Sequence, residues 1–234
     1  MKTTKPKTTK SKVSGRRKVD PELIRQLFER FEQDKPEPKT ELNYSNAFTL
    51  VTAVALSAQA TDVSVNKATG PLFAIADNPA DMLALGEDRL MQMISSIGLY
   101  RNKAKNVMAM CRILIDQYGG QVPMNREALI SLPGVGNKTA SVVLNEMDIE
   151  PAIAVDTHVY RVSHRLGLVD ASANTPDKVE KQLMQVIPKH WLTRAHHWLI
   201  LHGRYVCVAR KPKCDICIVR DICPKIGVDF TPLV

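Results

Sequence analysis

The stretch over residues 132–138 constrains the fold of this 234-residue chain more than any other. It reads Leu-Pro-Gly-Val-Gly-Asn-Lys, and an apolar helical segment over 126–131 precedes it. The Pro-Gly pair ends that helix. Gly136 permits a second unusual backbone turn, and the side chain of Asn137 can cap a following helix over 137–147. The pattern therefore predicts two helices joined by a tight hairpin.

The backbone of this hairpin is suited to bind an anion. Gly134, Val135 and Gly136 lie at the start of a helix, where free N–H groups and the helix dipole favour negative charge. No Gly-Lys-Ser/Thr ending follows and the preceding element is a helix, so a nucleotide-hydrolysing P-loop is not indicated. A phosphate of a nucleic-acid backbone is the favoured ligand. The alternative is a tight helix–helix turn in which the glycines serve only to avoid clashes.

Two residues near the hairpin can carry chemistry. Lys138 lies in the first turn of the second helix, where the positive end of the dipole disfavours an ammonium and favours a neutral amine. Beside a sugar-phosphate, such an amine is a nucleophile that can form a Schiff base. Asp156 follows an apolar run and precedes a helix expected over 157–166, which its carboxylate can cap. A capping carboxylate can also face a cleft and stabilise positive charge.

These motifs together resemble the helix-hairpin-helix DNA glycosylases, and specifically the endonuclease III family of bifunctional glycosylases and abasic-site lyases. The resemblance rests on Leu-Pro-Gly-Val-Gly-x-Lys at 132–138 and on Val-Asp-Thr-His-Val at 155–159. It covers nearly the whole chain except the N-terminal tail. It implies that Lys138 is the catalytic nucleophile and that Asp156 activates it and stabilises the developing sugar cation.

The resemblance also gives roles to two residues outside the hairpin. Gln59, at a junction between predicted helices, is expected to enter the space left by an extruded base. Leu99, which follows a glycine, is expected to be an apolar wedge that parts stacked bases. The alternatives are a polar residue at a helix corner for Gln59 and a leucine packed in the core for Leu99.

A group of cysteines near the C-terminus predicts a metal centre. Cys207, Cys214, Cys217 and Cys223 have the spacing C-x6-C-x2-C-x5-C. Four such thiols fit either tetrahedral zinc or a [4Fe–4S] cluster, and the family resemblance selects the [4Fe–4S] cluster. Its expected role is structural, because it would hold a terminus that has little core of its own. Cys111 lies in an apolar helix and is expected to be a packed thiol.

Three cations, Arg210, Lys211 and Lys213, lie between the first two of these cysteines. On a loop fixed by a metal centre they are placed to contact DNA phosphates, whereas a solvated basic loop is the alternative. A different group of side chains, His196, His197 and His202, is not expected to bind a metal. Helical geometry points these imidazoles in different directions, so their helix is expected to pack in the core.

The charge of +8 is concentrated at the N-terminus. Residues 1–18 hold eight Lys/Arg and no acid, so the remaining 24 Lys/Arg equal the 24 Asp/Glu. A disordered basic tail would attract nucleic acid non-specifically or only aid solubility. The chain has no apolar run of membrane-span length, no signal-peptide region and no disulfide-like cysteine pattern. We therefore expect an intracellular protein, in the cytoplasm or nucleoid if bacterial.

Hydrophobic periodicity predicts an all-α fold. After a first helix that starts at Pro21 and ends before Pro36, the pattern gives helices near 46–58, 62–69, 79–85, 87–96, 101–118, 125–131, 137–147, 157–166, 175–187 and 190–203. The resemblance implies two helical lobes, one over residues 40–150 and one combining 19–39 with 151–234. The active site would lie in the cleft between them.

The expected function is removal of oxidised pyrimidines from duplex DNA in base excision repair, followed by strand cleavage through a lysine Schiff base. A monomer would suffice. One alternative is a monofunctional glycosylase for another lesion or mismatch, in which Lys138 only contacts phosphate. The other is a non-catalytic iron–sulfur module that binds DNA or senses redox state. Asp156 disfavours the second alternative, because a pure binder needs no carboxylate near the phosphate, although a capping role would explain it.

Overall fold

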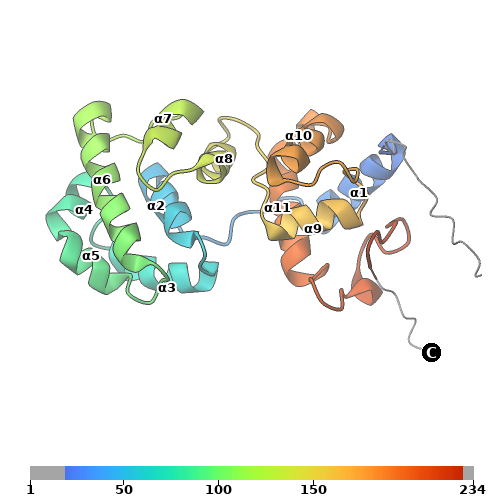
Figure 1. The fold of residues 1–234 in the computed structure, drawn as a ribbon, viewed down its shortest axis with the longest axis horizontal. Coiled ribbons are helices and arrows are strands. Elements are labelled where there is room, and N and C mark those ends of the chain that lie inside the picture. The colour runs from blue at the N-terminus through green and yellow to red at the C-terminus, as the bar shows by residue number, and fades with distance from the viewer. Residues whose placement is uncertain (1–18, 229–234) are drawn as a thin grey trace, which may run out of the picture.

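The computed structural model describes residues 19–228, so the basic tail over 1–18 and the roles expected for it lie outside the described residues. Between these limits the chain is helical and contains no strand (Figure 1). The α-helices are α1 (Pro21–Asp34), α2 (Ala47–Ser57), α3 (Asp62–Phe73), α4 (Pro79–Leu85), α5 (Glu87–Met93), α6 (Tyr100–Tyr118), α7 (Arg126–Ser131), α8 (Asn137–Glu146), α9 (Thr157–Arg165), α10 (Pro176–Val186) and α11 (Leu192–Tyr205). Two short 3-10 helices, η1 (Lys189–Trp191) and η2 (Cys214–Ile216), complete the set. The predicted all-α class is confirmed.

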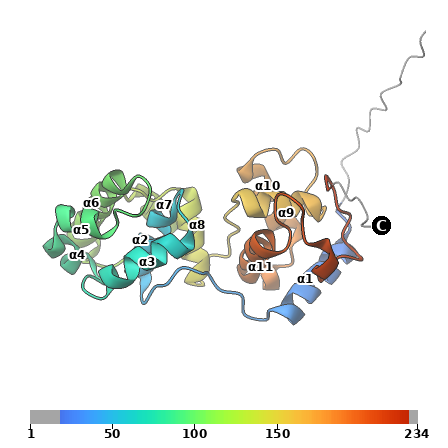
Figure 2. The same ribbon diagram turned by 90° about the horizontal axis from the view of Figure 1, so that it is seen from below.

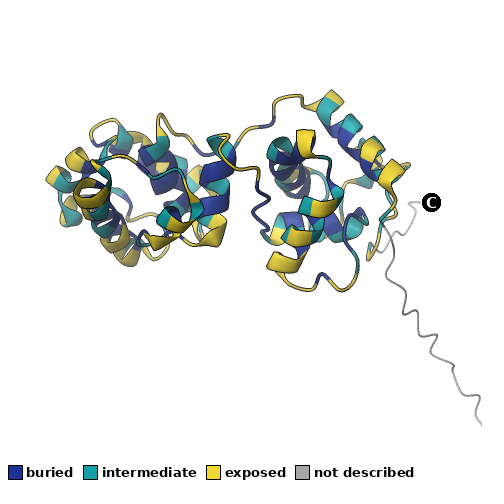
Figure 3. Cartoon of the chain, turned by 90° about the horizontal axis from the view of Figure 1, so that it is seen from above, coloured by how far each residue is buried: buried dark blue, intermediate teal, exposed yellow. Residues whose placement is uncertain are grey.

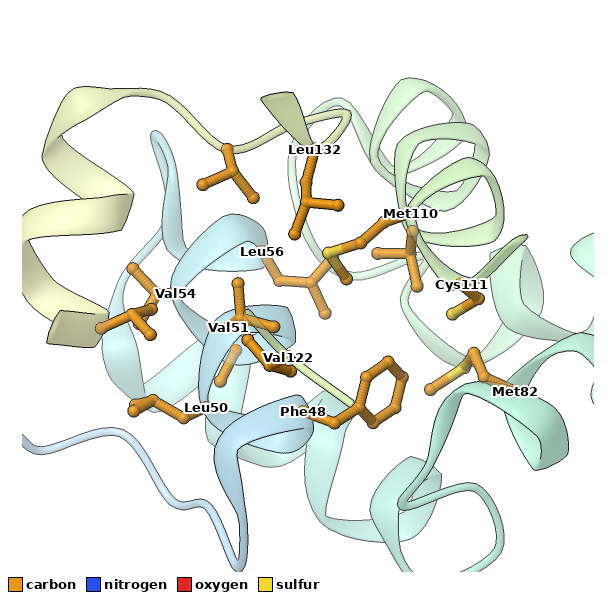
Figure 4. Packing of buried hydrophobic residues seen from close by; sticks show 14 of the residues in the cluster. Phe48, Leu50, Val51, Val54, Leu56, Met82, Met110, Cys111, Val122 and Leu132 are labelled. Atoms are coloured by element: carbon orange, nitrogen blue, oxygen red, sulfur yellow. The ribbon is translucent and has the colours of Figure 1, made fainter. Parts of the chain in front are cut away.

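The helices form two lobes, each around its own buried cluster of hydrophobic side chains (Figures 1 and 2). The first lobe contains α2 to α8, and its core lies within residues 42–144 (Figure 4). The second lobe joins α1 to α9, α10 and α11, with a core drawn from residues 24–31 and 153–219. Buried positions face the inside of each lobe and exposed positions lie on the outside (Figure 3). The residue limits predicted for the lobes, near 40 and 150, stay a prediction.

Aromatic side chains join α1 to a partner far along the sequence. The rings of Phe28 and Trp191 stack with centroids 5.7 Å apart. The indole N–H of Trp198 donates to the carbonyl oxygen of Lys35 at 2.8 Å, which holds the end of α1 against α11. Because the buried indole nitrogen finds a partner, Trp198 contributes apolar area without leaving an unsatisfied donor.

The chain passes between the lobes twice, once after α1 and once after α8 (Figure 2). Asn145, at the end of α8, is 1% exposed and secures the second crossing. Its Nδ2 donates to the carbonyl oxygen of Thr193 at 2.9 Å, and its Oδ1 accepts from the amide of Ala152 at 3.1 Å. Within the described residues, no helix has the length and apolar character needed to cross a membrane.

Several helix limits differ from those predicted. The helix expected over 62–69 continues through Gly70 and Pro71 to Phe73, although Pro71 lacks the N–H that would bond to the carbonyl oxygen of Lys67. The helix expected over 87–96 ends at Met93. The last predicted helix is divided into η1 and α11, and it extends two residues further, to Tyr205.

Candidate functional site

A cavity of about 780 Å³ lies between the lobes and brings several predicted site residues together. Lys138 and Gln59 reach it from the first lobe, and Asp156 reaches it from the second. Residues of α11, among them His196, His197 and Arg204, also line this cavity. Leu99 and the cysteine segment do not line this cavity.

Lys138 is the second residue of α8, and it is exposed to solvent. The helix begins after Gly136 and has no side-chain cap, so the cap predicted for Asn137 is wrong. Asn137 is already in the helix, and its side chain therefore starts one position too late to cap it. The amide of Ala140 donates to the carbonyl oxygen of Gly136 at 2.9 Å and opens the helical hydrogen-bond series. The amides before it point out of the helix end, beside the lysine.

The hairpin before α8 is shaped by one glycine. Gly134 has φ of +81°, and a Cβ there would lie 3.1 Å from the Cβ of Asn106 in α6, so conformation and packing both exclude a side chain. Gly136 has φ of −98°, an ordinary extended conformation, so the second unusual turn predicted there is wrong. A Cβ on Gly136 would meet nothing within 4 Å, which leaves the end of α8 open to approach.

Val135 shapes the hairpin, and its own amide is not free for the anion contact that its place in the motif predicts. Its side chain is 5% exposed and packs into the core of the first lobe. Its amide donates to the carbonyl oxygen of Leu132 at 3.1 Å, which closes the turn. Val135 therefore fixes the shape of the hairpin, and the amides available to an anion are those nearer the start of α8.

Asp156 is the N-cap of α9, as expected from its position in the sequence. One carboxylate oxygen, Oδ1, accepts from the amides of His158 and Val159, each at 2.8 Å. The cap uses this single oxygen, and Asp156 also lines the cleft. Capping and facing the cleft are therefore compatible in one side chain.

The imidazole of His196 is a part of the cleft wall that sequence reasoning missed. It is 4% exposed, and its Nδ1 has no hydrogen-bond partner among the described residues. Burial lowers the pKa of His196 to about 3, and the nearby His197, Lys138 and Arg204 act in the same direction. The imidazole is therefore neutral at physiological pH. A histidine pair directly before the apolar run of residues 198–201 was the signal available in the sequence.

Gln59 and Leu99 occupy two exposed loop tips of the first lobe. Both have left-handed backbones, with φ of 57° for Gln59 and 60° for Leu99. The side chain of Leu99 is 59% exposed, so packing in the core, the alternative considered for this residue, is wrong. The two loops lie close together, because a Cβ built on Gly98 would be 3.9 Å from the carbonyl oxygen of Gln59.

The four C-terminal cysteines are free thiols that surround one small cavity. Burial raises the pKa of Cys217 and of Cys223, and repulsion from neighbouring cysteines, including Cys207 and Cys214, adds to the effect. Thiols that disfavour one another's ionisation at close range are suited to a cationic centre that accepts thiolates. Donors are present for the sulfurs, since Arg165 Nη1 lies 3.5 Å from the Sγ of Cys207.

Four thiols around one cavity can bind either a tetrahedral zinc ion or an iron–sulfur cluster. Within residues 19–228, no group of three Cys, His, Asp or Glu side chains is arranged to hold a single metal ion. All four cysteines line one small cavity, so four thiolates can reach one centre, and a [4Fe–4S] cluster takes four such ligands. The residues present therefore fit a [4Fe–4S] cluster bound by all four thiolates.

Two arginines of α9 hold the backbone of the basic loop between Cys207 and Cys214 by hydrogen bonds. Arg165 donates to the carbonyl oxygens of Val208 and Ala209 at 2.7 and 2.9 Å. Arg161 donates to the carbonyl oxygen of Cys207 at 3.1 Å. The cations of this loop, Arg210, Lys211 and Lys213, are all exposed. A backbone held by hydrogen bonds thus presents three exposed positive charges to solvent.

Comparison with known proteins agrees with this geometry. A family model described as HhH-GPD superfamily base excision DNA repair protein matches residues 52–189, and one described as the iron–sulfur binding domain of endonuclease III matches residues 207–223. Endonuclease III of Rickettsia conorii is 56% identical over 202 residues, which cover 86% of this chain and 95% of that protein. Endonuclease III of Escherichia coli K12 is 51% identical over 198 residues, covering 85% of this chain and 93% of that protein.

Solved structures give the same result. A trapped endonuclease III–DNA covalent intermediate has a TM-score of 0.81 and 45% identity, and the match covers 88% of this chain and 97% of that one. A thermostable thymine-DNA glycosylase has a TM-score of 0.76 at 22% identity, a likeness that concerns the fold alone. The matches confirm the predicted fold class and the [4Fe–4S] cofactor. Since the identity exceeds one half over most of both chains, the chain belongs to the endonuclease III family of the HhH-GPD superfamily of base excision DNA repair proteins.

Proposed function

We propose that this protein is a monomeric DNA glycosylase and abasic-site lyase that removes oxidised pyrimidines from duplex DNA. The observation that carries the proposal is the meeting of Lys138 and Asp156, from opposite lobes, in one cavity. Its volume of about 780 Å³ lies within the range of about 300–1,000 Å³ that is usual for small-molecule sites. A nucleoside extruded from a duplex fits such a space.

DNA binding would use the two kinds of phosphate contact that the molecule offers. The open start of α8 presents backbone amides and the positive end of a helix dipole. Arg210, Lys211 and Lys213 supply charge on a loop whose backbone is fixed. Between these contacts, Leu99 would part the stack and Gln59 would fill the space of the departed base.

The chemistry follows from an amine and a carboxylate that face one sugar. Lys138 Nζ attacks C1′ while the glycosidic bond breaks, and the base leaves with the bonding electrons and takes up a proton. Asp156 stabilises the positive charge that develops on the sugar. The C1′–O4′ bond then breaks, O4′ takes up a proton, and the C1′ adduct becomes a Schiff base. Loss of a C2′ proton to a base drives β-elimination, which breaks the C3′–O3′ bond so that the 3′ strand leaves as its phosphate, and hydrolysis then returns the free amine. The [4Fe–4S] cluster, when bound, supplies a thiolate-held anchor for the C-terminal segment.

The comparisons support this proposal in one specific respect. The relatives include an endonuclease III trapped in covalent linkage to DNA and another in a non-covalent DNA complex. A lyase that acts through an amine forms such a covalent species, whereas a protein that only binds DNA does not.

Borohydride trapping tests the proposal directly. Wild-type protein is incubated with a duplex that contains one abasic site, and borohydride reduces any Schiff base to a stable adduct. We expect an adduct with the wild type and none with Lys138→Ala. Lys181→Ala, which removes an exposed lysine of α10, is the matched control and should form the adduct normally.

Two other outcomes would redirect the proposal. An adduct that persists in Lys138→Ala would assign the nucleophile to another amine. A wild type that binds the duplex and releases a base, but forms no adduct, would be a monofunctional glycosylase.

A further inference from the structure

Lys103 is a buried lysine that the proposed reaction does not use. It lies in the first turn of α6, and the whole residue is 8% exposed. Its ammonium donates to the carbonyl oxygen of Leu56 at 2.9 Å and to that of Ala58 at 2.7 Å. Both acceptors belong to the C-terminal end of α2, more than 40 residues earlier in the chain.

The position of the ammonium has a clear local explanation. The last carbonyls of a helix have no partner within the helix, and the negative end of the helix dipole attracts a cation. Ala58 ends α2 in a non-helical conformation, so Lys103 serves as the cap from a different helix. Burial lowers the pKa of Lys103, because desolvation disfavours the charged form, and the two hydrogen bonds to carbonyl oxygens hold the side chain in place.

The hydrogen bonds of Lys103 join the end of α2 to the start of α6, and the two loop tips described above lie beside these two helix ends. Gln59 follows Ala58 directly, at the end of α2. Leu99 is the N-cap of α6, and its carbonyl oxygen accepts from the amide of Lys103 at 3.1 Å. Each tip residue has a positive φ, a conformation that residues with a Cβ rarely adopt. Such conformations persist only where the surroundings hold them.

We infer that Lys103 is a positioning residue that fixes Gln59 and Leu99 relative to one another, so that both side chains enter the duplex as one rigid unit. The inference rests on the DNA roles proposed for these two residues. Parting a base step costs a few kcal/mol. Mobile loop tips would also lose conformational entropy when they insert into DNA, which weakens binding. Preorganised tips have already lost this entropy when the protein folds.

Lys103→Met tests the inference, because it keeps the length and apolar stem of the side chain and removes the ammonium. The first readout is fluorescence of 2-aminopurine placed opposite an uncleavable abasic-site analogue, which reports local unstacking when the tips insert. The second is the rate of borohydride trapping on a duplex with an abasic site, compared with the same strand alone, in which no stack has to be parted.

We expect Lys103→Met to abolish the fluorescence response and to slow duplex trapping about 10- to 100-fold, the scale of loss when a reacting group is misplaced by about an ångström. Trapping on the single strand should stay within about twofold of wild type, since the amine itself is unchanged. If Lys103→Met does not fold, Lys103→Gln, which keeps a polar NH₂ group but is shorter and uncharged, should show the same split between duplex and single strand.

A matched control separates positioning from stability. Met82 in α4 is fully buried, and Met82→Ala removes core packing of the same lobe without touching either tip. At a comparable loss of Tm, Met82→Ala should retain the fluorescence response and the duplex rate. In a Leu99→Ala background, Lys103→Met should have little further effect on the duplex rate, because the two changes act on one step.

The outcomes that overturn the inference are distinct from those that overturn the proposed function. A normal fluorescence response in Lys103→Met, or an equal loss in Met82→Ala, would leave Lys103 with a role in stability only. Absence of any adduct in wild type would reject the lyase proposal. The fluorescence response would still test Lys103 in that case, because insertion requires no covalent step.

Discussion

Glu146 and His197 contact one another across the two lobes, with Glu146 Oε2 only 2.9 Å from His197 Nε2 and both side chains 8% exposed. The other carboxylate oxygen, Oε1, accepts from the hydroxyl of Tyr44 at 2.9 Å. Burial raises the pKa of Glu146, but the contacts with His197 and Tyr44 outweigh this effect and lower it. The lobes are thus joined by a buried carboxylate that stays ionised.

Glu146→Gln should destabilise the fold by about 1–3 kcal/mol, because a buried charge-bearing contact loses its partner. Urea unfolding at neutral pH measures the change. Glu150→Gln is the control: Glu150 pairs with Arg126 at 2.9 Å but is 48% exposed, so its loss should cost about 0–1 kcal/mol. Because the folded pKa of Glu146 is depressed, its contribution is present above the unfolded pKa and is lost as the pH falls through the folded pKa. The difference between wild type and Glu146→Gln should therefore shrink in acid, and a constant difference would contradict this account.

A second prediction concerns His196, whose pKa burial lowers to about 3 in the folded protein. The unfolded chain takes up a proton near pH 6.5, and the folded chain does not. Stability should therefore fall as the pH decreases from about 6.5, by up to about 1.4 kcal/mol per pH unit from this residue. His196→Gln should flatten the dependence, as measured by urea unfolding at several pH values.

The control for this prediction is His190→Gln, which removes an exposed imidazole and leaves His196 in place. The other charged groups that act on His196, namely His197, Lys138 and Arg204, are intact in both variants. Equal slopes in wild type and His196→Gln would show that the buried imidazole is not the group responsible.

Asp156 offers a way to separate capping from catalysis. Asp156→Asn keeps an oxygen that can accept from His158 and Val159, so the stability of α9 should change by only a few tenths of a kcal/mol. Single-turnover base release should nevertheless slow by about 10²–10³-fold, because the charge that stabilises the sugar cation is gone. Asp156→Ala should add a loss of about 1 kcal/mol in stability, since the cap is removed as well. Full activity in Asp156→Asn would reduce the residue to a helix cap.

The basic loop should control how DNA affinity responds to salt. Replacing Arg210, Lys211 and Lys213 by alanine should reduce the slope of log K against log salt by about 2.7, or about 0.9 for each phosphate that is no longer neutralised. Titrations of a lesion-free duplex at several salt concentrations give this slope. The control replaces three exposed lysines on or near α10: Lys178, Lys181 and Lys189. Equal slopes in the two triple variants would show that the loop does not bind phosphate.

Features encoded by neighbouring residues could be predicted from the sequence. The start of α1 follows from Asp20, which accepts from the amide of Glu22, and from Pro21 at the first helical position. The cap at Asp156 and the free cysteines follow equally from local pattern. The second unusual turn predicted at Gly136 is wrong, because the sequence does not distinguish the two glycines of the motif. Only Gly134 takes a positive φ.

Features that depend on contacts between distant parts of the chain could not be predicted from the sequence. Lys103 reads as an ordinary polar residue of a long helix, and its burial depends on the end of α2. Glu146 and His197 are paired only because α8 and α11 meet between the lobes. The sequence places each of these residues on a helix, but it does not tell which other helix lies opposite.

The pairing of α1 with α11 also sets the order in which the molecule can be completed during synthesis. The core of the first lobe lies within residues 42–144 and can close while the ribosome is still at work. Phe28 must wait for Trp191, and the second core also includes Val219. At about 5–20 residues per second, the wait of Phe28 for Trp191 lasts about 8–33 s. Helix α1 is therefore made long before it can be buried, and the cleft acquires its second wall only after Arg204 has been made.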